Sequence, residues 1–381
     1  MKRQNIKRIG IDARFYGPLG KGLGRYTRQI VDQITGLDDS HEYVIFLGRE
    51  NFDDFKTSNP RVKKVLADIG WYGLAEQILF PFYIWWARLD LMHFPHFNVP
   101  VFCPIKFLVT IHDLILIKFP TRRATTLGPI IYAIKNFFYK IVIWRAVKRS
   151  RRVIAVSVYT KKDIIERFKI NPKKVTVTYE GVADFFRHSG AIDPSGRLLK
   201  YGLAKPYLLY VGNAYPHKNL ESLIKAFSLI GQRLKDLSLV LVGKEDYFYS
   251  RLKKTAQGIN ARIVFPGYVP DSDLKIIYAQ ALAYVFPSFY EGFGLPALEA
   301  MSFGLPVISS DRTCLPEILG QAAVFFNPAD QADMKEKIEM VIKDEKLRLE
   351  IAERGYRQVK KYSWSDCVRK TLEVYNEVLN K

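Results

Sequence analysis

The 381-residue chain has few cysteines, no long hydrophobic run and, in its first half, few acidic residues. Its three cysteines, Cys103, Cys314 and Cys367, are widely spaced and form no C-x-x-C pair. This pattern predicts buried thiols in a reducing compartment rather than a disulfide framework or a zinc site. The most apolar stretch, Ile78–Ala87, is too short to span a bilayer, and no signal-peptide core follows the basic start. We therefore expect a cytoplasmic protein.

The scarcity of acidic residues is local. Residues 1–190 contain 32 Lys and Arg against 16 Asp and Glu, whereas residues 191–381 contain 26 against 22. Between Leu114 and Lys162 there are 12 basic residues and no acidic one, with aromatic residues among them. Such a stretch suits an anionic membrane, a phosphorylated acceptor or a nucleic acid, and charge alone does not choose among them. No RNP, zinc-finger or helix-turn-helix signature supports a nucleic acid.

Short apolar runs alternate with longer mixed segments along the whole chain, which favours an α/β fold with two parallel, doubly wound sheets. A stretch with several glycines and little periodicity, Phe186–Leu203, is the expected linker. We predict strands near 9–12, 43–47, 62–66, 91–94, 107–111, 153–156, 207–211, 239–242, 263–265, 283–286, 307–309 and 324–326.

The most informative segment is Phe289–Ala300, which reads FYEGFGLPALEA. An apolar strand leads into it and Pro296 opens a helix, so it predicts a strand–turn–helix. Glu291 then lies on the loop and Glu299 about one turn into the helix, where both carboxylates can meet ligand hydroxyls. The N–H groups of Gly294 and Leu295 offer a place for phosphate. These features together suit a sugar nucleotide.

This segment resembles the E-x7-E motif of retaining GT-B glycosyltransferases of the glycogen-synthase-like family, glycosyltransferase family 4. That family includes bacterial lipopolysaccharide and lipid-linked mannosyltransferases. The resemblance covers nearly the whole chain, with further matches at 22–26, 110–114, 153–157, 210–219, 267–269 and 315–317. It implies two Rossmann-like domains facing each other across a cleft: residues 1–188 for the acceptor and 189–363 for the nucleotide sugar. A C-terminal helix, residues 364–381, is expected to pack back on the first domain.

The resemblance also implies roles for residues that bind the donor. Gly22, in a glycine-rich turn before a helix, is the position whose amide meets the diphosphate. Lys218, on a loop after the strand that ends at Gly212, supplies a positive charge to the same group. The family usually has an arginine at one of two positions in this loop, where this chain has Asn213 and His217. Diphosphate binding must then use Lys218 with helix N-termini, a charged His217, or an arginine elsewhere.

Within the same resemblance, Glu291 positions the sugar hydroxyls, Glu299 binds the ribose, and the Phe293–Leu295 turn lies beside the phosphates. His112, at the end of a predicted strand, touches the donor sugar. We interpret His93 and His96 as structural or acceptor-side residues. No metal or other cofactor is expected, and no histidine pair has metal-binding spacing. Asp271-Ser-Asp273 matches a metal-binding D-x-D, but its position before a helix favours a helix cap.

The sequence thus predicts a retaining, metal-independent hexosyltransferase that uses a nucleotide sugar and a glycan or lipid-linked acceptor at the inner face of the membrane. The Pro216–Asn219 loop resembles that of many bacterial mannosyltransferases, which favours GDP-mannose over UDP-sugars. A non-catalytic scaffold and a nucleic-acid-binding protein remain the alternatives. A helix expected between about Thr126 and Arg149 presents Ile134, Phe137 and Trp144 at helical spacing, which fits docking on an anionic membrane or packing on its own sheet.

Overall fold

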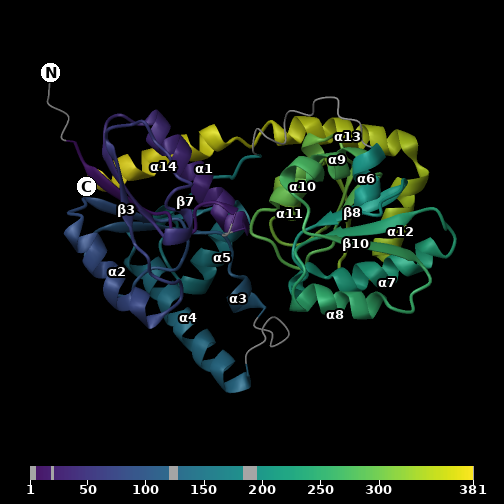
Figure 1. The fold of residues 1–381 in the computed structure, drawn as a ribbon, viewed down its shortest axis with the longest axis horizontal. Helices are drawn as coiled ribbons and strands as arrows, with labels where there is room; N and C mark the ends of the chain where they lie inside the picture. The colour runs from purple at the N-terminus through teal and green to yellow at the C-terminus, as the bar shows by residue number, and fades with distance from the viewer. Residues whose placement is uncertain (1–5, 19–20, 120–127, 183–194, 381) are drawn as a thin grey trace. The chain divides into compact units, whose positions relative to one another are not determined.

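The computed structural model describes residues 6–18, 21–119, 128–182 and 195–380 (Figure 1). They form two compact units. The first comprises the described parts of 1–118, 127–180 and 363–381, and the second those of 119–126 and 181–362. Each unit is built on one parallel β-sheet covered by helices on both faces, so the predicted α/β class is confirmed.

The first sheet has the order β3-β2-β1-β4-β5-β6-β7, and all neighbouring strands are parallel. This order reverses direction at β1, as in Rossmann-type sheets, whose ligands bind beyond the carboxyl ends of the strands. Its strands are β1 (Arg8–Asp12), β2 (Glu42–Leu47), β3 (Val62–Leu66), β4 (Leu91–Phe94), β5 (Phe107–Ile111), β6 (Arg152–Ala155) and β7 (Val175–Val177).

Two hydrophobic cores lie on the two faces of this sheet. On one face pack α1 (Lys21–Leu37) and the C-terminal helix α14 (Trp364–Leu379), which lie together in Figure 1. On the other face pack α2 (Leu74–Trp86), α4 (Pro129–Arg149) and α5 (Val158–Phe168). The spacing of Tyr26, Ile30 and Ile34 explains the first contact, because residues four apart lie on one side of a helix. Short helical segments complete the unit: η2 (Arg49–Asn51), α3 (Ile115–Lys118) and η4 (Pro172–Lys174).

The second sheet has the order β10-β9-β8-β11-β12-β13, again with parallel neighbours. Its strands are β8 (Tyr207–Val211), β9 (Ser238–Val242), β10 (Arg262–Gly267), β11 (Ala283–Phe286), β12 (Val307–Ser310) and β13 (Ala323–Phe326). Its helices are α6 (Ser195–Lys200), η6 (Pro216–Lys218), α7 (Leu220–Gly231), α8 (Tyr247–Ala256), α9 (Asp271–Gln280), α10 (Leu295–Ser302), α11 (Leu315–Leu319), α12 (Gln331–Lys343) and α13 (Glu345–Val359).

The structure corrects two local predictions. Helix α6 lies inside the segment expected to be a linker, where Arg197 and Lys200 pair with Asp273 of α9. Strand β7 was not predicted at all. The helix expected between about Thr126 and Arg149 is α4, which spans Pro129–Arg149, and Thr126 lies outside the described residues. Among the described residues, no helix has the length and apolar character needed to cross a membrane.

Candidate functional site

In the second unit, Glu291 and Glu299 lie on the predicted strand–turn–helix. Glu291 is in the loop after β11, and Glu299 is in the second turn of α10. Gly294 occupies the N-cap with φ +100°, and a Cβ there would stand 2.9 Å from Leu315 Cδ2. Glycine is therefore required for the turn that begins α10. The first helical turn leaves N–H groups without acceptors inside the helix, beginning near Leu295.

Lys218 and Glu291 form a direct ion pair. Lys218 Nζ lies 2.6 Å from Glu291 Oε1, and both side chains are largely buried. Two further hydrogen bonds fix the loops that carry them. The Phe289 N–H donates to the His217 carbonyl at 2.8 Å, and the Glu291 N–H donates to Thr313 Oγ1 at 3.1 Å. The loops after the adjacent strands β8, β11 and β12 therefore meet around this pair, at the edge where ligands of such sheets bind.

Glu299 is buried beside Tyr278, whose hydroxyl donates to Glu299 Oε2 at 3.3 Å. Both glutamates also act on Tyr284. Burial raises the pKa of Tyr284 well above its usual value, and the charges of Glu299 and Glu291 raise it further. The two carboxylates thus lie within electrostatic range of the same buried tyrosine.

His217 does not supply a positive charge in this structure. Burial, followed by the neighbouring Lys218 charge, lowers the pKa of His217 to about 3, so its ring is neutral near pH 7. The ring stacks on Tyr215, with 5.9 Å between centroids. Of the options for binding a diphosphate, a charged His217 is therefore disfavoured. Asn219 holds the N-cap position of α7, but its amide donates to the Pro328 carbonyl at 2.8 Å instead of capping the helix.

Gly212 and Phe293 have clear structural roles. The Gly212 carbonyl accepts a hydrogen bond from the Tyr249 hydroxyl at 2.8 Å, and a Cβ on Gly212 would stand 2.7 Å from the Tyr210 hydroxyl. The Phe293 ring is buried and packs edge-on against Tyr362, with 5.6 Å between centroids. Any contact of Phe293 with a donor would therefore use its backbone.

In the first unit, His112 is held at both ring nitrogens. Nδ1 lies 3.0 Å from Glu180 Oε1, and Nε2 lies 2.9 Å from the Pro95 carbonyl oxygen. Both partners are acceptors, so both contacts are satisfied as hydrogen bonds when the two nitrogens each carry a proton. Burial alone would lower the pKa of His112, but the Glu180 hydrogen bond and charge, with the Pro95 carbonyl, raise it overall. A sugar hydroxyl would have to share or replace one of these acceptors.

Gly22 lies in the first turn of α1, which begins at Lys21 rather than at the predicted Leu23. It is exposed, and open space surrounds the place that a Cβ would take. The tightly constrained glycine of this segment is Gly24, where a Cβ would stand 2.0 Å from the Gly17 carbonyl oxygen. Gly22 therefore offers an accessible N–H at a helix start, while Gly24 permits the close approach of loop and helix.

A buried charge cluster beside β1 escaped the sequence analysis. Arg14 Nη2 lies 2.7 Å from Asp12 Oδ2 and 2.5 Å from Glu76 Oε1, and Asn98 Nδ2 donates to Glu76 at 2.7 Å. All four side chains are buried. Their contacts join β1, α2 and the loop after β4. The signal in the sequence was Asp12-Ala-Arg14, two opposite charges directly after an apolar strand.

The other histidines differ in role. His93 is fully buried, with Nδ1 2.7 Å from the Tyr375 hydroxyl and Nε2 3.0 Å from Thr110 Oγ1, so it is structural. His96 follows β4, and its ring lies against that of Phe97 at a tilt of 43°, with 3.9 Å between centroids. Its Nδ1 is buried and has no hydrogen-bond partner in the described structure. Of the two residues assigned as structural or acceptor-side, only His96 has an unused polar atom.

Two family models match the chain. The model described as Glycosyltransferase Family 4 covers residues 20–184, and the one described as Glycosyl transferases group 1 covers residues 200–358. The chain belongs to glycosyltransferase family 4. Most of the first match lies in the first unit, and the second match lies in the second unit.

Curated relatives of this glycosyltransferase include bacterial mannosyltransferases. The O-antigen chain mannosyltransferase B of Escherichia coli is 29% identical over 377 residues, which cover 93% of this chain and 95% of that protein. The serotype-specific mannosyltransferase WbdA of Escherichia coli is 30% identical over 242 residues, 61% of this chain and 29% of that longer protein.

A solved structure supports the fold. The sucrose-phosphate synthase of Thermosynechococcus elongatus superposes with a TM-score of 0.76 over 98% of this chain and 99% of its own, at 19% sequence identity. The two Rossmann-like sheets are thus those of a GT-B glycosyltransferase.

The D-x-D segment of this glycosyltransferase precedes α9 as expected, but the predicted helix cap was wrong. Pro270 takes the N-cap of α9, with no side-chain hydrogen bond to the cap. Asp273 instead accepts from Tyr201 at 2.6 Å and pairs with Arg197 and Lys200. No cluster of His, Cys, Asp and Glu able to hold a metal occurs among the residues that the structure describes.

Proposed function

We propose that the protein transfers a hexose, preferably mannose, from a nucleotide diphosphate sugar to a glycan or lipid-linked acceptor, with retention at the anomeric carbon and without a metal. The Lys218–Glu291 ion pair carries this proposal. It joins a cation suited to a diphosphate and an acceptor suited to sugar hydroxyls, at the edge of a sheet where nucleotides bind. The mannosyltransferase names of the relatives support the choice of sugar.

Donor binding would open the ion pair. The diphosphate offers Lys218 stronger acceptors than a carboxylate, and Glu291 is then released to accept hydrogen bonds from the sugar hydroxyls. Glu299, behind it in α10, binds the ribose hydroxyls. The first-turn N–H groups of α10 near Leu295 add positive potential beside the phosphates.

The chemical step exchanges two bonds at the anomeric carbon. The acceptor oxygen attacks from the face that the nucleotide leaves, the bond to the phosphate oxygen breaks, and the acceptor proton passes to that departing oxygen. Lys218 stabilises the charge that grows on the diphosphate, which is the most effective place for a fixed cation. In the first unit, Gly22 offers its N–H to the diphosphate, and His112 contacts the edge of the donor sugar.

Membrane docking is the second part of the proposal. Outward-facing side chains of α2 include Trp85 and Trp86, which are 67% and 84% exposed, and those of α4 include Phe137, which is 61% exposed. Both helices cover the same face of the first sheet, so these groups belong to one side of the unit. Lys135 and Lys140 lie on α4 as well. Exposed aromatics beside basic residues fit the interface of an anionic membrane, where a lipid-linked acceptor would be found.

Thermal shift with a panel of nucleotide sugars tests donor choice, because a ligand that binds only the folded state raises the melting temperature. We expect GDP-mannose to give the largest shift. Proton NMR of the product of that donor then reports the anomeric configuration. A panel without any shift, together with no donor hydrolysis, would favour a non-catalytic scaffold. An inverted product would exclude the proposed mechanism.

A further inference from the structure

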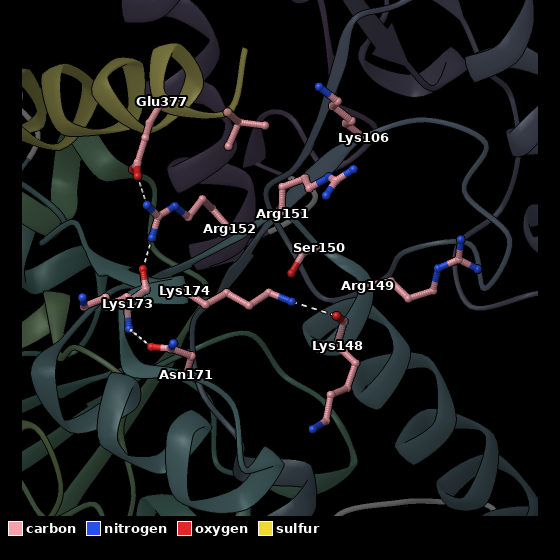
Figure 2. A pocket seen from close by; sticks show the side chains of 11 residues that line it. Lys106, Lys148, Arg149, Ser150, Arg151, Arg152, Asn171, Lys173, Lys174 and Glu377 are labelled. Atoms are coloured by element: carbon pink, nitrogen blue, oxygen red, sulfur yellow. Dashed lines mark hydrogen bonds and ion pairs between the residues drawn. The ribbon is translucent and has the colours of Figure 1, made fainter. Parts of the chain in front are cut away.

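A basic pocket lies at the amino ends of β5, β6 and β7, on the opposite edge of the first sheet from His112. Its cavity has a volume of about 550 Å³. Seven of its side chains carry a positive charge and one carries a negative charge (Figure 2). The lining charged residues are Lys106, Lys148, Arg149, Arg151, Arg152, Lys173, Lys174 and Glu377.

This pocket is separate from the proposed transfer site. Lys106 directly precedes β5, and His112 directly follows it. Six residues of extended chain place the two ends of the strand roughly 20 Å apart. A ligand in the pocket is therefore not the diphosphate of a donor held at the carboxyl edge of the sheet.

The one acid does not neutralise the pocket. Glu377 of α14 already pairs with Arg152, and the Arg152 guanidinium also donates to the Lys173 carbonyl. Figure 2 shows these contacts and the Lys174 Nζ, which donates to the Lys148 carbonyl at 2.8 Å.

Four cationic side chains have neither a carboxylate nor a backbone carbonyl as a partner among the described residues, whereas Lys148 and Lys174 each donate to a carbonyl. The four are Lys106, Arg149, Arg151 and Lys173. They come from three segments: the start of β5, the end of α4 with the start of β6, and the turn η4 before β7.

Burial and like charge both act on one lysine of the pocket. Burial lowers the pKa of Lys174 to about 8, and the charges of Lys148 and Arg151 contribute to the decrease. Like charges that act on one another in this way repel, and a bound anion would offset that repulsion.

We propose that this pocket binds a phosphate-bearing ligand with at least two negative charges, independently of the donor site. The ligand is either a soluble phosphate compound or the headgroup of an anionic phospholipid. Arginine guanidinium groups bind phosphate oxygens through paired hydrogen bonds, and Arg149 and Arg151 lie on the same chain segment as Lys148. Lys173 lines the same cavity from η4, with its side chain directed away from Arg149 in Figure 2, so a ligand that reaches both segments would lie between them.

Isothermal titration calorimetry with sodium pyrophosphate at low salt tests the site. Because pyrophosphate can also occupy the donor site, the titration is made in the Lys218→Ala background. We expect a saturable binding event there, weakened at least tenfold by adding Arg151→Glu with Lys173→Glu. The matched control is Lys56→Glu with Lys63→Glu, which makes the same charge change at exposed lysines of the same unit. Equal melting temperatures would show that both doubles are folded.

Two arms separate the sources of phosphate. Vesicles of phosphatidylcholine with cardiolipin, whose headgroup carries two phosphates and two negative charges, are co-sedimented with each variant, with and without pyrophosphate. Binding of pyrophosphate without competition against vesicles assigns the pocket to a soluble ligand. Vesicle binding that pyrophosphate displaces and the pocket variant loses assigns it to a lipid headgroup. Hydrogen exchange should slow at 148–152 and 171–174 in either case. No saturable pyrophosphate binding, or equal binding by pocket and control variants, overturns the proposal.

Discussion

The carboxyl edges of the two sheets hold their charges in different ways. In the second unit, Lys218 and Glu291 meet through one contact of 2.6 Å between two loops. In the first unit, His112 donates from both ring nitrogens to Glu180 and Pro95. Arg14 there contacts two buried carboxylates within its own unit.

This difference indicates where a ligand can gain binding energy. An ion pair of one cation and one carboxylate opens when a ligand brings an anion to the first and hydroxyls to the second, because both partners are compensated. Arg14 already pairs with two carboxylates, so a ligand that binds to it must first break one of these contacts, which costs as much as the new contact provides. We therefore expect the electrostatic part of transfer to depend on the second unit. The first unit would contribute shape, the acceptor site and surfaces for docking.

The largest expected effect is the loss of the Lys218 charge. Lys218→Ala should lower kcat for the preferred donor by about 30- to 1000-fold, about 2–4 kcal/mol, because the diphosphate loses its fixed cation in the transition state. Lys225→Ala, at an exposed lysine of α7 in the same unit, is the control and should leave kcat unchanged. Turnover of Lys218→Ala within a few-fold of wild type would remove this residue from the mechanism.

The two glutamates should separate in a binding experiment. Glu299→Gln should weaken the bare nucleoside diphosphate about tenfold, since a hydrogen bond to a charged group contributes about 1.5–3 kcal/mol. Glu291→Gln should bind that ligand at least as well as wild type, because it removes the competitor for Lys218. It should nevertheless transfer sugar slowly.

Calorimetry with the nucleoside diphosphate, followed by kinetics with the whole donor, distinguishes these outcomes. Equal loss of nucleotide binding in both glutamate variants would contradict the division of roles and the idea of an opening ion pair.

Two histidines, one in each unit, should make the free energy of unfolding depend on pH in opposite directions. His217 has a folded-state pKa of about 3, below the ordinary 6.5, so its stabilising effect is complete above about pH 6.5 and is lost as the pH falls. The loss is about 1.4 kcal/mol for each pH unit below 6.5. His112 has a raised pKa, so its contribution is present below pH 6.5 and is lost as the pH rises through its folded-state value.

Urea unfolding of His217→Gln and His112→Gln between pH 5 and 8 measures these terms. Compared with wild type, His217→Gln should lose less stability as the pH falls. His112→Gln should lose less stability as the pH rises. Identical pH profiles for wild type and both variants would mean that neither ring has the described protonation state.

Much of the fold could be predicted from the sequence, because buried parallel strands read as apolar runs. Strand β7 was missed because its three residues, Val175-Thr-Val177, are too short for a pattern. Helix α6 was missed because glycines around it resemble a linker, whereas its ion pairs with Asp273 depend on tertiary contact.

For the site, too, local features could be predicted from the sequence and long-range contacts could not. The sequence analysis singled out motif residues such as Lys218, Glu291 and Glu299 because their chemistry and spacing are local. It did not predict which residues pair, because Glu180 is 68 residues from His112 and Lys218 is 73 residues from Glu291. Spacing along the chain carries no information about which of two charges meets the other.

The smallest expected effect concerns the surface of the first unit. Phe137 of α4 is 61% exposed. Phe137→Ser should weaken binding to vesicles of phosphatidylcholine with phosphatidylglycerol by about fivefold, about 1 kcal/mol, because only part of the ring would be buried in lipid. Leu229→Ser, at a 48% exposed position on α7 of the second unit, is the matched control. We expect it to leave binding unchanged, because the docking surface belongs to the first unit.

Co-sedimentation at low and high salt gives the readout for Phe137→Ser. Binding should require anionic lipid and fall as salt is raised, since screening weakens the attraction of the basic residues beside the aromatic ones. The aromatic contribution should persist at high salt, so the ratio between wild type and Phe137→Ser should change little. One contrary outcome is an equal loss of vesicle binding in Phe137→Ser and Leu229→Ser. The other is binding to neutral vesicles that equals binding to anionic ones. Either result would place the membrane contact elsewhere and favour an acceptor that is not held at a membrane.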